Sequence, residues 1–304
     1  MTLLARSKNK HYSTFTVLKS SGRKRLICNP DNVLRRAQYR ILKLLEESVE
    51  VPDYIHAFEK NKSIPALAEL HVGKACVVSF DIKDYFTSIT QIMLDRLFMD
   101  TFNIGASASR TLSEVCTYKY FVPQGGLTSP KLANLITATT FGPAIKDYCD
   151  ERGLVYTVYA DDITISFPVR SLFIKEEVAE LKQFVYETLK SFGFRVNTQK
   201  TKVMWTNQRQ YVCGVVVNSH TNMKKADRLK LRAIVHNMEK NGIAAEAEKS
   251  SMDAASFYSH IHGKVNWYKQ LNPVHGGILS DKLKRIYEAH KTSLKESPVN
   301  LADI

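Results

Sequence analysis

The sequence lacks the features that would place it in several other classes of protein. No stretch approaches the roughly 18 to 20 unbroken apolar residues that a membrane span requires. The N-terminal segment has neither the apolar stretch nor the small-residue cleavage site of a signal peptide. We expect a cytoplasmic protein with reduced, mostly buried thiols and no membrane partner. Its cysteines are odd in number and widely spaced, and no C-x-x-C pair indicates a zinc or redox motif: Cys28, Cys76, Cys116, Cys149 and Cys213.

Acidic residues are almost absent from the first 43 residues. This stretch contains eleven Lys or Arg residues and a single acid, Asp31, so it carries most of the net charge of +13 of the whole chain. A field of this kind attracts polyanions and strengthens their binding by releasing condensed counterions. A merely solubilising surface would mix both signs of charge. The charge distribution therefore predicts a nucleic-acid partner.

Apolar runs predict several strands. Residues 12–28 are typical of a hairpin with a basic turn around residues 20–22. Residues 75–80 form a short, partly β-branched run that is typical of a buried strand. Two more strands are predicted within residues 154–167, around a turn that contains two acids, and others within 202–217. Together with the helices below, these strands indicate an α+β fold.

Apolar residues at helical spacing predict several helices. Asp31 is expected to cap a helix that begins after Pro30, with an apolar face formed by Val33, Leu34, Ala37, Ile41, Leu44 and Leu45. Ser129 and Pro130 are expected to begin one long helix that runs to about residue 150. The remaining predicted helices cover residues 173–192, 225–240, 254–271 and 278–290. The last dozen residues are expected to be frayed.

Three aspartates are candidates for metal-ion chemistry. Asp81 ends the strand at 75–80, and Asp161 and Asp162 lie at the tip of the hairpin at 154–167. Nucleotidyl transfer uses two divalent ions about 3.5 to 4 Å apart, and such hard cations prefer carboxylate ligands. Acids are also common in turns for conformational reasons. Two adjacent ionised carboxylates repel each other unless a cation lies between them, which favours a metal site.

Five segments resemble, in order and spacing, the successive palm motifs of reverse transcriptases. They are F-D-I-K-D-Y-F-T-S-I (80–89), V-P-Q-G-G-L-T-S-P-K-L-A-N (122–134), Y-A-D-D (159–162), G-F-R-V-N-T-Q-K-T-K (193–202) and Y-V-C-G-V-V-V-N (211–218). The resemblance implies a right-hand polymerase with fingers, a palm made of an antiparallel sheet packed on helices, and a small helical thumb. The implied boundaries are 1–75 for the fingers, 76–217 for the palm with a fingers insertion at about 100–128, and 218–304 for the thumb and C-terminal tail.

The resemblance also implies roles for individual residues. Asp81, Asp161 and Asp162 match the catalytic ligands of two Mg²⁺ ions, which Mn²⁺ can replace. Lys200 matches a lysine that protonates the departing pyrophosphate, although charge neutralisation alone is equally compatible with its position. Cys213 and Gly214 occupy the primer-grip turn. The residues that match nucleotide-binding positions are Lys24, Arg25, Ile82, Lys83, Asp84, Phe86 and Gln124.

Four of these nucleotide-binding residues also have a simpler alternative role. Phe86 matches the aromatic gate that selects deoxynucleotides, but an aromatic residue here also suits ordinary core packing. Gln124 resembles the glutamine that contacts the incoming nucleotide, and it can equally serve as a cap in the loop before a helix. Lys24 and Arg25 resemble the cations that hold the triphosphate, with Arg25 the better match, and both also suit contacts to the template backbone.

Two further features resemble the compact retron class of bacterial reverse transcriptases. Ala68 and His71 match a retron Asn-Ala-x-x-His pattern, with Leu67 in place of the asparagine. Cys213 replaces threonine in a Val-Thr-Gly triplet at the primer-grip turn. Taken alone, His71 is more typical of a structural histidine with satisfied hydrogen bonds.

The retron resemblance implies a particular substrate and particular partners. A structured noncoding RNA would act as primer and template, and synthesis from a 2′-OH would give a 2′-5′ branched RNA–DNA hybrid (msDNA). An effector protein, a toxin, and a role in defence against phage are also implied. Two alternatives remain: a group II intron-like reverse transcriptase, which would need an additional maturase or DNA-binding region, and a nucleic-acid scaffold that restrains a toxic effector.

The C-terminal third is rich in cations and aromatic residues. The cations suit a thumb that grips a nucleic-acid duplex, and they are Lys224, Lys225, Arg228, Lys230 and Arg232. Tyr258, Trp267 and Tyr268 are possible stacking platforms for bases, but their helical spacing favours positions in the core of the thumb.

Overall fold

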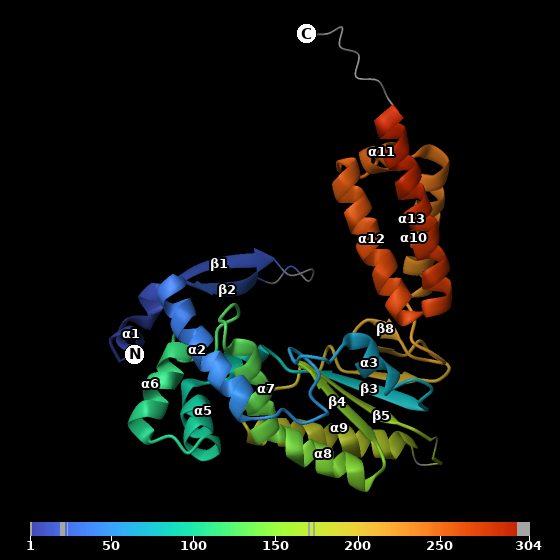
Figure 1. Cartoon of the computed structure of the whole chain (residues 1–304). Helices are drawn as coiled ribbons and strands as arrows, with labels where there is room; N and C mark the ends of the chain where they lie inside the picture. Colours follow the sequence, from blue (N-terminus) through green and yellow to red (C-terminus); the bar gives the residue numbers. More distant parts are fainter. Residues whose placement is uncertain (1, 19–21, 23, 170, 173, 297–304) are drawn as a thin grey trace, which may run out of the picture. The chain divides into compact units, whose positions relative to one another are not determined.

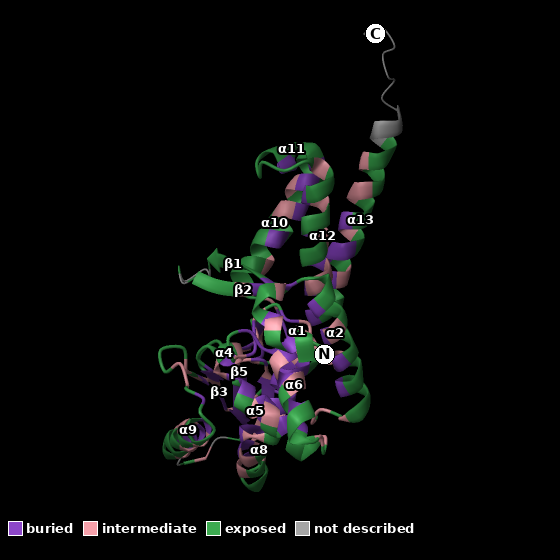
Figure 2. Ribbon diagram, turned by 90° about the vertical axis from the view of Figure 1, so that its left-hand side faces the viewer, coloured by how far each residue is buried: buried purple, intermediate pink, exposed green. Residues whose placement is uncertain are grey.

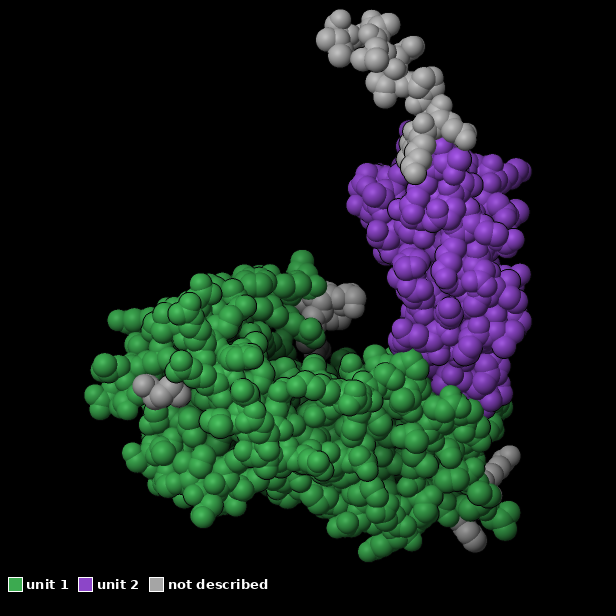
Figure 3. All heavy atoms as spheres, in the orientation of Figure 1, with its two compact units in different colours: residues 1–213 green, residues 214–304 purple. Residues whose placement is uncertain are grey.

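The chain forms two compact units, Met1–Cys213 and Gly214–Ile304 (Figures 1 and 3). The computed structural model describes residues 2–18, 22, 24–169, 171–172 and 174–296. Each unit has its own cluster of buried apolar side chains, and Figure 2 shows buried residues inside unit 1 and along helices of unit 2. Among the described residues, no helix is both long enough and apolar enough to cross a membrane.

The N-terminal hairpin predicted by the sequence is present. Strands β1 (Tyr12–Leu18) and β2 (Lys24–Pro30) pair antiparallel after the short helices α1 (Thr2–Ser7) and η1 (Lys8–His11). Of the predicted turn, Ser20 and Ser21 lie outside the described residues.

Helix α2 (Asn32–Ser48) follows, with the predicted cap: the Asp31 carboxylate accepts from the Val33 and Leu34 amides at 3.0 and 2.9 Å. Its buried side is narrower than predicted. Val33 and Leu44 are 59% and 62% exposed, because the buried stripe has the spacing of a single helix face. That stripe consists of Leu34, Gln38, Ile41 and Leu45.

The centre of unit 1 is a four-stranded antiparallel sheet in the order β4-β5-β3-β6. Its strands are β3 (Cys76–Asp81), β4 (Val155–Tyr159), β5 (Asp162–Phe167) and β6 (Lys202–Trp205). Successive side chains of a strand point to opposite faces. The apolar face contains Val78, Phe80 and Ile165, and helices α8 (Phe141–Glu151) and α9 (Ile174–Ser191) cover it (Figure 1). The opposite face is polar, with Ser79, Thr157, Thr164 and Ser166.

His71 lies on this polar face, just after helix α3 (Ile64–Glu69). It is fully buried, and its two ring nitrogens bond the hydroxyls of Ser166 and Thr157, each at 2.8 Å. Burial is the main cause that lowers the pKa of His71 to about 3, so the ring is neutral. The structure therefore confirms the structural alternative for this histidine: it joins the segment after α3 to two strands of the sheet.

The single helix predicted for 129–150 is wrong. The chain forms α7 (Ser129–Thr139) and α8, separated at Thr140, whose φ and ψ are −120° and −104°. The reason is Pro143, which has no amide hydrogen and whose ring would clash with the carbonyl four residues earlier in a continuous helix. The predicted cap is also displaced, because Thr128 occupies the N-cap position and makes no side-chain cap bond.

Four shorter helices complete unit 1: α4 (Tyr85–Ser88), α5 (Gln91–Arg96), η2 (Leu97–Thr101) and α6 (Ala106–Cys116). Two short strands, β7 (Tyr211–Val212) and β8 (Val215–Val216), flank the boundary between the units. Four of the five cysteines are buried, all five are free thiols, and Cys213 is partly exposed.

Unit 2 is helical. It contains α10 (Lys225–Asn241), α11 (Ile243–Glu248), α12 (Ala254–Leu271) and α13 (Pro273–Glu296). The predicted helices at 225–240 and 254–271 are confirmed, whereas the last helix begins five residues before the predicted start at 278. Of the frayed tail predicted there, residues 297–304 lie outside the described residues.

The candidate stacking residues of unit 2 differ in burial. Tyr268 is buried, and Tyr258 stacks on Tyr287 with 4.0 Å between ring centroids, so Tyr258 and Tyr268 belong to the core. Trp267 is half-buried.

Candidate active site

The three candidate aspartates meet at one end of the sheet. Asp81 and Asp162 are directly opposite each other in the antiparallel pair of β3 and β5, and Asp161 precedes β5 in the turn. Side chains that are opposite in such a pair lie on the same face with Cβ atoms about 4.5 to 5.5 Å apart. The turn is tight: Ala160 has φ +55°, and the Ile82 amide donates to the Asp161 carbonyl at 2.8 Å. Residues 80 positions apart in sequence thus become neighbours.

The electrostatics of this cluster show an excess of negative charge. Burial, followed by repulsion from Asp161 and Asp81, raises the pKa of Asp162 to about 6. Burial is also the main cause that raises the pKa of Asp161, with a further contribution from Asp81. The Lys200 ammonium donates to Asp81 Oδ2 at 2.6 Å, and this hydrogen bond is the main cause that raises the pKa of Lys200. Lys200 is therefore a cation held against the carboxylates.

The donor chemistry of the cluster fits a hard divalent cation. Three carboxylates converge, and a cation between them would relieve the repulsion that contributes to the raised pKa values of Asp161 and Asp162. In the conformation described, Lys200 occupies one oxygen of Asp81. Within the described part of the chain, no set of three or more His, Cys, Asp or Glu side chains is gathered closely enough to hold a metal ion as it stands. Asp81, Asp161 and Asp162 are the residues that would hold one.

The carboxylates open onto a cavity of about 780 Å³ in unit 1. Its lining combines these acids with cations, an aromatic wall and a glycine-rich loop, all from residues far apart in sequence. Of the residues with predicted roles, the lining contains Arg25, Asp81, Ile82, Lys83, Asp84, Phe86, Gln124, Asp161, Asp162 and Lys200. This volume is in the range of pockets that bind small molecules.

The two candidate cations of the hairpin differ in position. Arg25 contributes to the cavity, and Lys24 does not. Since successive residues of a strand point to opposite sides, the two side chains cannot face the same space. The structure thus brings Arg25, and not Lys24, together with the aspartates.

Gln124 is positioned by the glycine that follows it. The Cys28 amide of β2 donates to the Gln124 carbonyl at 2.8 Å, which brings the hairpin and this loop into close contact. Gly125 has φ +111°, and a Cβ there would lie 2.7 Å from the Cys28 carbonyl oxygen. Only glycine allows this backbone path.

The segment after Asp81 places an aromatic ring in the cavity lining, and its backbone amides are hydrogen-bonded within the protein. Phe86 is half-buried and lines the cavity, and Asp84 has φ +51° at the N-cap of α4. The resemblance implies that the backbone amides of Ile82 and Lys83 face the triphosphate. In this arrangement they donate instead to the carbonyls of Asp161 and Arg195, so neither amide is free for a triphosphate.

The predicted primer-grip turn lies close to the acidic cluster on its unit 1 side. Burial, followed by the charges of Asp162 and Asp161, raises the pKa of Cys213 to about 12. Cys213 and Gly214 both have positive φ, +48° and +84°, as a tight two-residue turn requires.

Phe58 lines the cavity but lies outside every segment that the sequence patterns singled out. Its backbone is left-handed, with φ +62°, which is rare for a residue with a bulky side chain. It sits in an irregular segment where no apolar periodicity singles it out, so only the folded chain reveals its position.

Comparison with known proteins supports a family assignment. The model of the family "Reverse transcriptase (RNA-dependent DNA polymerase)" matches residues 17–217. The chain is 30% identical over 298 residues to retron Mx65 reverse transcriptase of Myxococcus xanthus, covering 92% of this chain and 66% of that protein. It is 29% identical over 241 residues to retron Ec86 reverse transcriptase of Escherichia coli, covering 78% of this chain and 73% of that protein. The chain thus spans about two thirds to three quarters of the length of these relatives.

Solved structures show the same architecture. Telomerase from Candida albicans, in complex with a fragment of telomeric RNA, has a TM-score of 0.52 and 12% identity, covering 93% of this chain and 64% of that one. Apo telomerase from Candida tropicalis has a TM-score of 0.51 and 12% identity, covering 96% of this chain and 62% of that one. At such identity the likeness establishes the right-hand polymerase fold alone. The family model and the two retron relatives show that the chain belongs to the reverse transcriptase (RNA-dependent DNA polymerase) family and is of the retron type.

Proposed function

We propose that the chain polymerises DNA on an RNA template, with the cavity beside Asp81, Asp161 and Asp162 as its active site. The observation that carries this proposal is the pairing of Asp81 with Asp162 at the end of β3 and β5, next to Asp161. In this proposal the three carboxylates hold two Mg²⁺ ions, which Mn²⁺ can replace. The ions, when bound, activate the attacking oxygen and stabilise the leaving phosphate.

Other residues of the cavity bind and orient the nucleotide. Arg25 lines the cavity and suits bidentate contact with a phosphate, and Gln124 with Gly125 brings polar backbone close to the substrate. Phe86 forms an apolar wall for the sugar. Lys200 is already protonated beside Asp81, so it can neutralise the pyrophosphate or give it a proton. Lys24, on the other side of the hairpin strand, is better placed to contact template phosphates.

We assign the subdomains by the family likeness. Residues 1–75 and about 100–128 form the fingers, the rest of 76–217 forms the palm, and 218–304 form the thumb and tail. Cys213 and Gly214 form the primer-grip turn.

The retron relatives support a more specific activity. We propose that a structured noncoding RNA serves as primer and template, that synthesis starts at a 2′-OH, and that the product is a branched RNA–DNA hybrid (msDNA). An effector protein and a role in phage defence in the bacterial cytoplasm complete the proposal. The net charge of +13 suits the RNA partner.

The test is a primer-extension assay with the full chain and the RNA that copurifies with it. We expect deoxynucleotide incorporation only with Mg²⁺ or Mn²⁺. Replacing Asp161 and Asp162 together by Asn should abolish extension and leave RNA binding intact. A matched double control is Asp147→Asn with Asp150→Asn on α8, which should extend normally. Persistent synthesis by the Asp161/Asp162 variant would reject the proposed active site.

A further inference from the structure

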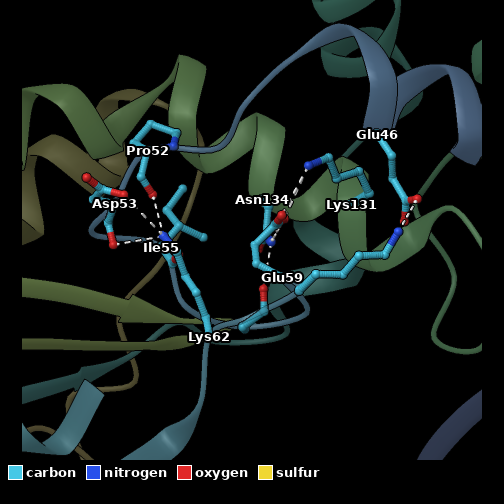
Figure 4. Close-up of polar contacts among 10 residues, drawn as sticks. Glu46, Pro52, Asp53, Ile55, Glu59, Lys62, Lys131 and Asn134 are labelled. Atoms are coloured by element: carbon cyan, nitrogen blue, oxygen red, sulfur yellow. Dashed lines mark hydrogen bonds and ion pairs between the residues drawn. The ribbon is translucent and has the colours of Figure 1, made fainter. Parts of the chain in front are cut away.

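The segment that contains Phe58 is closed into a compact loop by one lysine. The Lys62 ammonium donates to the carbonyls of Pro52, Asp53 and Ile55 at 3.3, 3.0 and 2.8 Å (Figure 4). An ammonium group has three N–H donors, so the three carbonyls use all of them. The loop is thereby fixed at its base.

The start of this loop is joined to a strand of the candidate active site. Ile55 forms a parallel bridge with Val158 of β4. The His56 amide donates to the Val158 carbonyl at 2.9 Å, and the Val158 amide donates to the Tyr54 carbonyl at 2.7 Å. Val158 stands three residues before Asp161. The position of the loop is therefore set by the strand that leads to the catalytic turn.

The tip of the loop is joined to α7 by a buried polar cluster. Asn134 Nδ2 donates to the Ala57 carbonyl at 2.7 Å and to Glu59 Oε1 at 2.8 Å (Figure 4). The Lys131 ammonium lies 3.3 Å from both carboxylate oxygens of Glu59. Lys131 and Asn134 are buried, and Glu59 is largely covered. The residues on either side of Phe58 are thus both held by α7.

Phe58 itself is left with an exposed ring and a strained backbone. Its φ of +62° is unfavourable for an L-residue, and such a conformation persists only where the surroundings impose it. The side chain is 51% exposed and lines the cavity. Its ring meets that of Phe86 edge-on, with 6.3 Å between centroids. A half-exposed ring held in this way adds little to core packing, which indicates a role in the cavity.

We propose that Phe58 is a second specificity-determining residue for the nucleotide sugar, and that Glu59, Lys131 and Asn134 are positioning residues that hold it against Phe86. This inference rests on the proposed polymerase function. The anionic phosphates of a nucleotide need the charged part of the cavity, where Arg25 and Lys200 lie and where the aspartates would hold a cation. Its sugar then meets the apolar wall of Phe58 and Phe86. Phe58 limits how far Phe86 can move away when a ribose 2′-OH presses on it.

The proposal predicts a loss of sugar selectivity when the ring of Phe58 is removed. In Phe58→Ala, the ratio of kcat/KM for a deoxynucleotide to that for the matching ribonucleotide should fall about tenfold. The change should arise mainly from a higher kcat/KM for the ribonucleotide, because no group that contacts the phosphates is removed. Phe58→Tyr should keep the selectivity. Tyr39→Ala removes a similarly exposed ring, outside the cavity lining, and serves as the control.

The positioning residues are tested through their coupling to Phe58. Lys131→Met should reduce the same selectivity ratio, and Lys131→Arg should restore most of it. Adding Phe58→Ala to Lys131→Met should cause little further loss, because both changes remove one constraint on Phe86. Lys146→Met, which breaks the exposed pair with Asp150, is the matched control. If Lys131→Met does not fold, the comparison is made with Glu59→Gln, which keeps the shape of the side chain.

The outcomes separate this inference from the function on which it rests. No deoxynucleotide incorporation by the wild type would overturn the proposed function. Incorporation by the wild type, with unchanged selectivity in Phe58→Ala or with an equal loss for both sugars, would overturn only the role of Phe58. Fully additive losses in the double variant would overturn the positioning role of Lys131.

Discussion

Asp81 and Asp162 face each other across neighbouring strands, so two carboxylates occupy one end of the sheet on the same polar face. Like charges placed directly opposite each other in a sheet are destabilising. Their repulsion, with that of Asp161, contributes to the raised pKa of Asp162. The fold therefore holds mutually repelling carboxylates at the place where the proposed metal ions would bind.

This arrangement predicts that Asp162→Asn stabilises the metal-free protein. The pKa of Asp162 rises from 3.8 to about 6 on folding, so the folded state disfavours the ionised form. Protonated Asp162 therefore contributes to the unfolding free energy below pH 3.8. This contribution is lost as the pH rises through about 6. Asp162 keeps contact with solvent although the cluster partly buries it, and solvent screens its charge, so we expect a gain of only about 1 kcal/mol in the unfolding free energy above that pH.

Urea unfolding with a chelator present measures this effect. Divalent ions should stabilise the wild type and should stabilise Asp162→Asn much less, because the variant lacks a ligand. Asp147→Asn on α8 is the control and should change stability by less than about 0.5 kcal/mol. A destabilised Asp162→Asn protein in chelator would contradict the repulsion argument.

His71 predicts a specific dependence of stability on pH. Its pKa is lowered from 6.5 to about 3, so folding requires the neutral ring. The unfolded chain takes up a proton below pH 6.5 while the folded chain does not. The stability that His71 contributes is thus complete above pH 6.5 and is lost as the pH falls toward 3, by a few kcal/mol in total.

The variant His71→Gln should show a smaller loss of stability across this pH range than the wild type. It should also be less stable near neutral pH, by about 1 to 3 kcal/mol, because the hydroxyls of Ser166 and Thr157 lose well-placed partners. Urea titrations at several pH values provide the measurement. His260→Gln changes an exposed histidine of unit 2 and should leave the pH profile unaltered. Equal slopes for His71→Gln and the wild type would argue against a buried neutral ring.

Gly125→Ala should disrupt the loop of Gln124. The new methyl group would lie 2.7 Å from the Cys28 carbonyl oxygen, at a φ of +111°. We expect the KM for deoxynucleotides to rise at least about tenfold and the unfolding free energy to fall by about 2 kcal/mol or more. Gly153→Ala is the control for backbone strain alone, since φ is +62° and no atom lies within 4 Å of its Cβ. Similar effects of both changes would mean that contact with β2 is unimportant.

The thiol of Cys213 should be unreactive in the wild type and more reactive when the acids are removed. Its pKa is raised to about 12, first by burial and then by Asp162 and Asp161, and only the thiolate is a good nucleophile. Replacing both aspartates by Asn should lower this pKa and speed alkylation by iodoacetamide at neutral pH. Mass spectrometry of the Cys213 peptide measures the rate. The buried Cys149 serves as the internal reference, and equal acceleration at both sites would indicate loosened structure instead.

Local sequence was enough to predict the motifs and most of the regular elements. Strand β3 ending at Asp81, the hairpin with Asp161 and Asp162, and the cap of α2 by Asp31 all follow from local preferences of a few neighbouring residues. Pro143 is also a local signal, and it is sufficient to exclude a single helix over residues 129–150. Local patterns are reliable where the cause of a structure lies within one turn or one strand.

The tertiary structure alone decided how these pieces meet. The choice between Arg25 and Lys24 as the cation that faces the cavity depends on the direction of β2 relative to the four-stranded sheet. The hydrogen bond of the Ile82 amide and the two hydrogen bonds of the His71 ring are made with residues about 80 to 95 positions away in the sequence. The position of Phe58 depends on the contacts among Glu59, Lys131 and Asn134, and no local sequence preference favours its left-handed backbone. Contacts between distant residues impose such conformations, and their energies appear only once the chain has folded.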